Sequence, residues 1–263
     1  MDMEDRAKIS NRDEFYIGYR KMPVRLRVFS LVVAFVLLLA SSGLAFGLYL
    51  AQKAPPTTRL VRAPVLGGIF QADPYPMLHI APTAEDPDGG TVLMHRPGKH
   101  GVPADKAREL NGKPVQVGGA FFTRDGTRLL QVGLSGGNQL RLADPDEVDT
   151  STWVAFTPEP LGHFRLKGKI VDHKCFLGGM IPGQGKTHRG CATYCLASGV
   201  PPMFASFRPD GSLVSYVLAR PDGKALGPDA LKYVAAPIEV EGEVERVGDL
   251  LVFKIDLDSI RRL

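Results

Sequence analysis

Three cysteines and one histidine form the densest group of metal-ligating side chains in the sequence. Cys175, His188, Cys191 and Cys195 fall within 21 positions and include every cysteine of the 263-residue chain. If HRGCATYCLA is helical, its histidine and two cysteines share one helix face, because they occupy positions i, i+3 and i+7. The Gly-rich GGMIPGQG can fold Cys175 back over that face. Thiolates and imidazole bind zinc, copper and iron, so the segment predicts a transition-metal or redox centre.

Two other interpretations of the cysteines stay open at this point. A disulfide from Cys175 to Cys191 or to Cys195 would close a loop of about 17 to 21 residues and leave one thiol free. A Cys191–Cys195 bridge would be strained, because side chains four apart on a helix run nearly parallel. The third interpretation is purely structural cysteines. Basic neighbours favour thiolates, which keeps a thiol–disulfide oxidoreductase among the alternatives; they are His173, Lys174, Lys186 and Arg189.

Several nearby side chains are candidates for supporting roles. Asp172 and His173 immediately precede the cysteine segment, and we expect them next to the metal ligands, with the carboxylate orienting a histidine. Met180 and Met203 are soft groups that suit copper. In the first half of the chain, His95 and His100 lie in the Gly/Pro-containing MHRPGKHG, where a second metal site is a further hypothesis.

Other chemistries find little support. GQGKT resembles a phosphate-binding loop, but the glycine that the motif requires five positions before Gly185 is Met180, so no nucleotide is expected. The C-x-x-C-H motif of c-type haem is absent. We found no Ser-His-Asp order, paired-carboxylate setting or G-x-S-x-G elbow, so independent catalytic activity is not expected. The net charge of +4 comes without Lys/Arg blocks, which argues against nucleic acid.

An uncharged run of 24 residues, 28–51, predicts a transmembrane helix. At about 1.5 Å per residue it spans a hydrocarbon core of roughly 30 Å. A cleaved signal peptide is the rival, but its apolar region is usually only about 7 to 15 residues long. More basic residues precede the run than follow it, so we expect residues 1–27 to be a cytoplasmic leader on a single-pass anchor in the inner membrane. The rest of the chain would then be periplasmic.

We expect the exported part of the chain to consist of two similar β units. Alternating patterns such as HFRLKGKIVD and PIEVEGEV predict short strands. Residues 107–132 can be laid over 230–255, with a one-residue gap that brings RDG against RVG. We expect a linker at 52–63, a first OB-like unit at 64–143, a second linker at 144–162 and a second OB-like unit at 163–263. The fold is therefore expected to be mainly β, a transmembrane helix followed by two small OB-like barrels, the second with a short helical Cys/His insertion. A β-sandwich is the alternative.

The run IVDHKCFLGGMIPGQGKTHRGCATYCLASGVPPM, together with DEFYIGY, DPYPML and GKHG, resembles a group of bacterial single-pass membrane-anchored proteins with exported OB-like domains. The resemblance implies an accessory role beside membrane redox enzymes, such as molybdenum oxidoreductases with cytochrome b partners. It carries no activity and no site residue with it. The haem chaperone of cytochrome c maturation is similar only in being an anchored OB domain, since its H-x-x-x-Y motif is not reproduced here. We therefore expect the lipid bilayer as one partner and a membrane redox complex as another.

Overall fold

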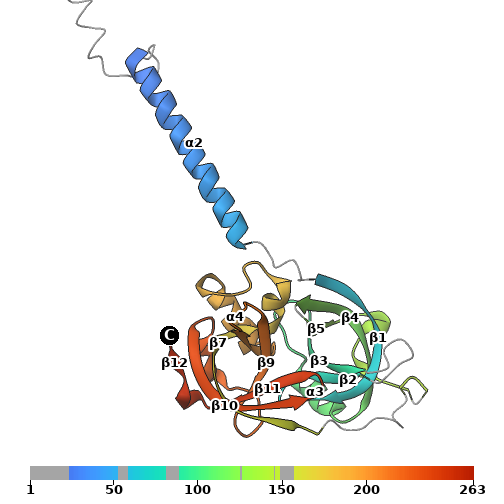
Figure 1. Cartoon of the computed structure of the whole chain (residues 1–263). Helices are drawn as coiled ribbons and strands as arrows, with labels where there is room; N and C mark the ends of the chain where they lie inside the picture. The colour runs from blue at the N-terminus through green and yellow to red at the C-terminus, as the bar shows by residue number, and fades with distance from the viewer. Residues whose placement is uncertain (1–23, 53–58, 81–88, 125, 145, 149–156) are drawn as a thin grey trace, which may run out of the picture. The chain divides into compact units, whose positions relative to one another are not determined.

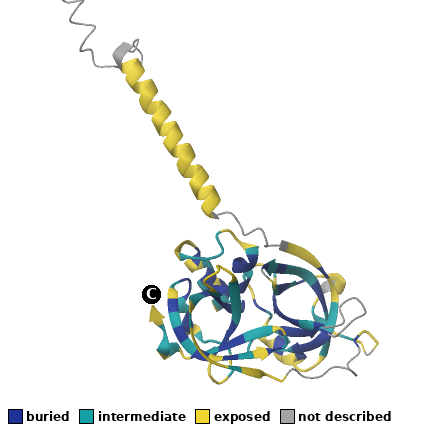
Figure 2. Ribbon diagram, in the orientation of Figure 1, coloured by how far each residue is buried: buried dark blue, intermediate teal, exposed yellow. Residues whose placement is uncertain are grey.

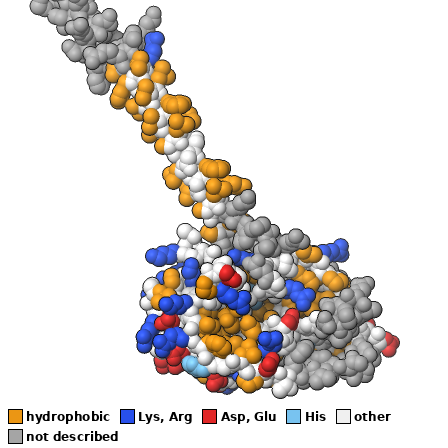
Figure 3. All heavy atoms as spheres, viewed as in Figure 1, with side chains coloured by type: hydrophobic (Ala, Val, Ile, Leu, Met, Phe, Trp, Pro, Cys, Tyr) orange, Lys and Arg blue, Asp and Glu red, His pale blue; other side chains and the backbone are white. Residues whose placement is uncertain are grey.

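A single long helix opens the described part of the chain. The computed structural model describes residues 24–52, 59–80, 89–124, 126–144, 146–148 and 157–263. Helix α2 (Val24–Gln52) contains a stretch, Leu26–Ala51, with mean hydropathy 2.4 and no buried residues, which is long and apolar enough to cross a membrane. Residues 26–51 are exposed (Figure 2), and the side chains on the face drawn in Figure 3 are largely hydrophobic. The predicted 28–51 lies within this helix.

The strands after the helix form two closed five-stranded barrels of the same topology (Figure 1). The first consists of β1 (Arg59–Gln71), β2 (Met77–Ile80), β3 (Gly90–His95), β4 (Pro114–Arg124) and β5 (Thr127–Val132). Their order is β1-β2-β3-β5-β4, and pairing of β4 with β1 closes the barrel. A short helix, α3 (Ala104–Leu110), joins β3 to β4, and the two-residue strand β6 (Arg141–Leu142) extends the sheet beside β4.

The second barrel repeats this arrangement. Its strands are β7 (Glu159–Asp172), β8 (Pro202–Phe207), β9 (Leu213–Ala219), β10 (Pro237–Val247) and β11 (Leu250–Ile255), closed by β10 pairing with β7. A 3₁₀ turn, η4 (Pro228–Tyr233), takes the place of α3, and β12 (Arg261–Arg262) takes the place of β6. Closure of both sheets confirms the OB-like interpretation over the β-sandwich.

The internal repeat is closer than the sequence comparison suggested. Gly119 pairs with Val132, and Gly242 pairs with Ile255 in the same register. A Cβ at either glycine would collide with the opposite strand, 1.9 Å from the oxygen of Gln131 or 2.2 Å from that of Lys254. Connections of equal length join β4 to β5 and β10 to β11, so the two repeats align here without a gap. The prediction of a one-residue gap that brings RDG against RVG was therefore wrong. The strands β1 and β7 also begin earlier than expected, inside the segments assigned to linkers.

The two barrels share a core. Each has an interior cluster of its own, and a third cluster takes buried residues from both. From the first barrel this shared cluster includes Met77, Leu93 and Phe122, and from the second it includes Phe176 and Met203. Polar contacts cross the same boundary, such as Thr127 Oγ1 to Ser215 Oγ at 2.6 Å. The barrels therefore pack directly against each other within one unit, Ala54–Leu263.

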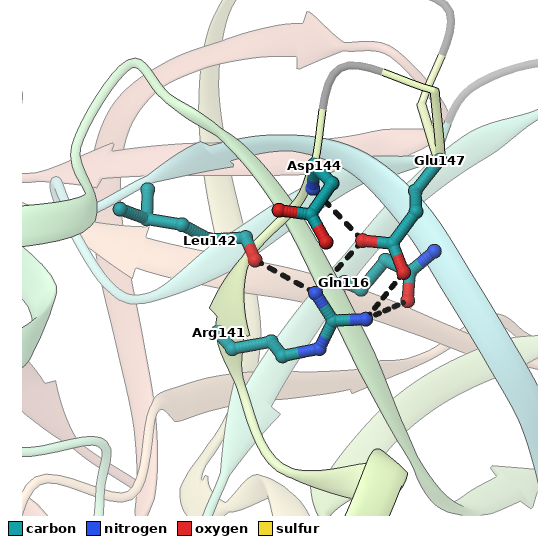
Figure 4. A network of polar contacts seen from close by, with 5 residues as sticks. All are labelled: Gln116, Arg141, Leu142, Asp144 and Glu147. Atoms are coloured by element: carbon teal, nitrogen blue, oxygen red, sulfur yellow. Dashed lines mark hydrogen bonds and ion pairs between the residues drawn. The ribbon is translucent and has the colours of Figure 1, made fainter.

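A polar network holds the segment that follows β6 (Figure 4). The guanidinium of Arg141 donates to both carboxylate oxygens of Glu147, at 2.7 and 2.5 Å, and to the Gln116 side chain at 2.8 Å. The backbone N–H of Asp144 also donates to Glu147, at 2.8 Å. These bonds place the buried Val148 against β1 at Gly67, where an added Cβ would lie 2.6 Å from Val148 Cγ2.

Candidate metal centre

The cysteine segment is an excursion between two neighbouring strands of the second barrel. Strand β7 ends at Asp172, which pairs with Pro202 at the start of β8, and residues 173–201 connect the two strands. A π-helical turn, η2 (Cys175–Gly179), starts the connection, and Gly178 lets the chain reverse with φ of +112°. The loop then returns over the turn so closely that a Cβ at Gly183 would lie 2.1 Å from the Cys175 carbonyl oxygen. The predicted folding back of the Gly-rich loop is thus present.

The second half of the excursion is helical. A 3₁₀ turn, η3 (Lys186–His188), leads into α4 (Arg189–Ala197), with His188 at the N-cap position. Helix α4 confirms the predicted helical segment and carries Cys191 and Cys195. Its C-terminal end is held by the first barrel, because Gly101 N–H donates to the Ser198 carbonyl at 2.8 Å.

The four predicted ligands and Asp172 fall into two overlapping groups of three. Cys175, His188 and Cys191 form one group, and Asp172, Cys175 and Cys195 form the other; within each, the ligand atoms all lie within 4.8 Å of one another. Cys175 belongs to both groups. All three cysteines are free thiols, and only Cys191 is more than marginally exposed. The described residues therefore contain a Cys/His cluster that could bind a metal.

Asp172 organises this cluster. Its side chain is fully buried, and its Oδ2 accepts a hydrogen bond from His188 Nε2 at 2.9 Å. Its Oδ1 accepts from the Cys175 backbone N–H at 2.8 Å. Because a carboxylate can only accept, Nε2 carries the proton and Nδ1 keeps the lone pair that a metal needs. A carboxylate can orient a ligating histidine through such a bond. The carboxylate of Asp172 also belongs to one of the two groups of candidate ligand atoms.

The thiols differ in how readily they ionise. The pKa of Cys175 is raised, first because its thiol donates to Cys195 and then because it is buried beside Asp172. The same hydrogen bond lowers the pKa of Cys195, and the positive charge of Lys99 adds to this effect. Cys195 is thus the thiol that ionises more easily of this pair. A bound cation would relieve the repulsion that Asp172 imposes on Cys175.

Lys99 from the first barrel covers the exposed side of the cluster, and sequence reasoning missed it. Its Nζ donates to Cys191 Sγ at 2.8 Å and lies 5.7 Å from the centre of the Tyr194 ring. The contact with Cys191 raises the pKa of Lys99. The hairpin that carries Lys99 is held in turn by Lys174, whose Nζ donates to the Gly98 carbonyl at 2.6 Å. Lys99 lies in GKHG, one of the segments on which the resemblance to membrane-anchored proteins rests. However, 92 positions separate it from Cys191, so no local sequence pattern connects the two residues.

Of the other side chains that the sequence suggested as ligands or supporting groups, only some lie near the cluster. Met180 Sδ lies 3.7 Å from Cys191 Sγ, beside the cluster, whereas Met203 is buried in the core shared by the barrels. His173 is buried, and among the described residues its ring nitrogens have no hydrogen-bond partner, so it makes no such bond to the cluster. His95 is fully buried and His100 is exposed, which does not support the hypothesis that these two share a metal.

The arrangement presents three sulfur donors, one imidazole and the carboxylate of Asp172, with a thioether and an ammonium at its edge. Such a donor set suits a soft or borderline transition metal and does not suit magnesium or calcium. No family model, curated protein or solved structure matches the chain.

Proposed function

We propose that this chain is a membrane-anchored accessory or electron-transfer subunit that holds one transition-metal ion on the periplasmic face of the inner membrane. The metal is bound by Cys175, His188, Cys191 and Cys195, with Asp172 behind His188. The observation that carries the proposal is the sharing of Cys175 by two groups of ligand atoms, each within 4.8 Å. One group contains His188 and Cys191, and the other contains Asp172 and Cys195.

The membrane part of the proposal rests on α2 and its flanking charges. The described helix is long and apolar enough to span a bilayer. Arginine and lysine are more frequent before it than directly after it, which favours a cytoplasmic N-terminus. Active alkaline phosphatase fused after Leu263 would support this orientation, because the enzyme needs the oxidising periplasm to fold. An inactive fusion together with an active cytoplasmic reporter at the same position would overturn it.

A non-catalytic role follows from the number of protein donors. Four protein ligands close a tetrahedral site, whereas a catalytic zinc keeps one position open for water or substrate. A closed copper or iron centre can pass single electrons, and a closed zinc centre can only support structure. The metal found in the protein therefore distinguishes an electron-transfer subunit from an assembly subunit.

Metal analysis of the full chain in detergent tests the proposal. We expect one zinc, copper or iron per chain, with sulfur and nitrogen neighbours in X-ray absorption spectra. Cys191→Ser should lower the metal content at least tenfold, while Thr193→Ala, on the same helix and outside the cluster, should leave it unchanged. A folded, metal-free protein that takes up none of Zn(II), Cu(I) or Fe(II) would rule the proposal out.

The contact between Lys99 and Cys191 favours a second candidate, a thiol–disulfide oxidoreductase. A nearby ammonium stabilises a thiolate, and Cys191 is the most accessible of the three thiols. The Cys191 thiolate would attack a substrate disulfide and release one substrate thiolate. Cys175, whose sulfur lies within 4.8 Å, would then displace the second substrate thiolate and leave a Cys175–Cys191 disulfide.

Alkylation and mass spectrometry separate the candidates. For the oxidoreductase, alkylation of Cys191 should slow several-fold in Lys99→Met and stay unchanged in Lys106→Met, an exposed lysine of α3. The unreduced protein should also show a reversible Cys175–Cys191 bridge. A permanent bridge that resists mild reduction would instead favour a structural staple in a non-catalytic interaction module. A bridge involving Cys175 cannot coexist with a metal that uses all three thiolates.

A further inference from the structure

A cavity of about 260 Å³ lies where the end of α4, the turn η4 and the first barrel meet. Its wall includes Leu196 of α4, Val200 just after that helix and Leu231 of η4. Tyr75, from the connection between β1 and β2, closes it on the side of the first barrel. None of the four proposed metal ligands lines this cavity, so it is a feature separate from the Cys/His cluster.

The cavity has a buried floor and an exposed rim. Ile170, Val200 and Val234 are at most 1% exposed, whereas Ala197 and Pro228 of the same wall are exposed to solvent. A small molecule can therefore enter at the rim while the barrels stay packed. An apolar cavity of roughly 150 Å³ already holds benzene, so this one has room for two fused rings.

The wall is apolar and carries no charge. Its described residues include no Asp, Glu, Lys, Arg or His, and the hydroxyl of Tyr75 is the one polar side-chain group among them. Backbone N–H groups along the wall are already bonded, as from Val200 to Cys195, from Ala230 to Gly227 and from Val234 to Leu231. A charged ligand would lose its hydration here without gaining a partner. The wall therefore suits an uncharged, largely apolar molecule.

The hydroxyl of Tyr75 is a hydrogen-bond donor without an acceptor among the described residues. Tyr75 is 8% exposed, and its oxygen accepts from the Leu226 backbone N–H at 2.9 Å. Leu226 also lines the cavity, which places the phenol oxygen at the wall. Burial raises the pKa of Tyr75, so the hydroxyl keeps its proton at physiological pH. Buried donors are rarely left unsatisfied, and an acceptor on a bound ligand would complete this one.

We propose that this cavity binds an uncharged ring compound with one carbonyl oxygen, which accepts a hydrogen bond from the hydroxyl of Tyr75. A ketone carbonyl fits better than an alcohol or an amide, because it accepts without bringing a proton that needs an acceptor of its own. The rings would fill the apolar floor formed by Ile170, Val200 and Val234. The proposal does not depend on whether the Cys/His cluster binds a metal.

Methyl NMR titration of the full chain in lipid nanodiscs tests the site with two probes. These are 1-indanone, a fused bicyclic ketone, and indane, the same ring system without the carbonyl. Both should give saturable shifts of the Leu231 and Val234 methyl groups on the cavity wall. The methyl groups of Val92, which is buried in the interior of the first barrel, should not shift.

Tyr75→Phe separates the hydrogen bond from the apolar contacts. Because one hydrogen bond is lost, 1-indanone should bind about 2- to 10-fold more weakly, while the affinity for indane stays the same. Tyr194→Phe, at an exposed tyrosine of α4 outside the cavity, should change neither affinity.

Ala230→Leu adds volume at a buried wall position and should weaken both probes at least tenfold. If that variant does not fold, the comparison of Tyr75→Phe with Tyr194→Phe still decides. No saturable shift of the wall methyl groups with either probe would overturn the proposal. Binding of 1-indanone that Tyr75→Phe leaves unchanged would mean an apolar void only and would also overturn it.

Discussion

Asp172 shows how one buried residue can organise a cluster whose members are scattered over 24 positions, 172–195. Its two oxygens hold the backbone of Cys175, near the start of the excursion, and the imidazole of His188, in the middle of it. A change at this residue should therefore disturb the proposed ligands Cys175 and His188 while leaving both side chains in place.

Replacing the carboxylate by an amide tests this dependence. Asp172→Asn keeps the shape but loses the charge that favours the Nε2–H form of His188. We expect metal affinity to fall about 10- to 100-fold, and the free energy of unfolding to fall by about 1–3 kcal/mol. Chelator competition and thermal unfolding measure the two effects. Asp210→Asn, at an exposed turn carboxylate that accepts from Ser212 N–H at 2.8 Å, is the control; equal losses in both variants would contradict the role of Asp172.

The residues of the candidate site could be predicted from the sequence where they lie close together along the chain. The cysteines and His188 could be singled out because their types are rare and their spacing is short, and Asp172 because it directly precedes them. Lys99 and the burial of His95 could not, since both depend on how one barrel meets the other. A lysine in a Gly-rich hairpin has the same local sequence whether it faces water or a thiol.

At the scale of elements, close backbone contacts decide how the first barrel reaches the cluster. A Cβ added at Gly101 would lie 2.2 Å from the Gly199 carbonyl oxygen, just beyond the end of α4. The hairpin that carries Lys99 is thereby set against the excursion, and only glycine allows this approach.

Gly101→Ala should therefore push the hairpin away from α4. We expect a loss of about 1–3 kcal/mol in unfolding free energy, as for other overpacked positions. Gly190→Ala is the matched change inside α4, where nothing lies within 4 Å of the added Cβ. That variant should gain about 0.5–1 kcal/mol, because alanine favours the helix. A Gly101→Ala protein as stable as wild type would show that the contact is dispensable.

The network after β6 predicts a pH dependence. Hydrogen bonds from Arg141 and from the Asp144 N–H lower the pKa of Glu147 from 4.5 to about 2. A lowered folded-state pKa means that its contribution to stability is present above about pH 4.5 and is lost as the pH falls toward 2. The difference in urea stability between wild type and Glu147→Gln should therefore be constant near neutral pH and shrink over that acid range.

The control for this experiment is Asp146→Asn, a neighbouring exposed carboxylate. It should change stability little at any pH. Added salt should reduce the Glu147 effect, because the pair is exposed to solvent. A Glu147→Gln difference that persists unchanged at pH 2 would show that the charge is not its cause.

At the scale of the whole molecule, the core shared by the two barrels should make them unfold together. Phe176 of the second barrel packs against the first, where the Arg124 guanidinium lies 4.3 Å from its ring centre. Phe176→Ala should cost about 3–5 kcal/mol and should reduce hydrogen-exchange protection in β3 and β5 as well as in β8. Phe207→Ala, at an exposed phenylalanine, should leave protection unchanged. Loss of protection confined to the second barrel would mean that the barrels are independent.

The two barrels could be predicted from alternation and from their internal similarity, but their packing could not. Strand β2 is buried along its whole length and β3 nearly so, because one face lines the barrel and the other meets the second barrel. Continuous apolar runs such as TVLM carry a signal for burial on both faces. They do not say which surface covers the second face, so the partner barrel is found only from the fold.

The excursion of residues 173–201 leaves and re-enters the barrel at adjacent paired positions, Asp172 and Pro202. The two ends of the excursion are therefore held together by one pair of neighbouring strand residues. The flanking strands β7 and β8 follow the same path as β1 and β2 of the first barrel, where a much shorter connection joins the two strands. The register between β7 and β8 is therefore set by their own ladder, whereas the packing of the barrels depends on the excursion through Phe176 and Leu177. The Cys/His cluster is thus carried on a segment that the two barrels also need for their own packing.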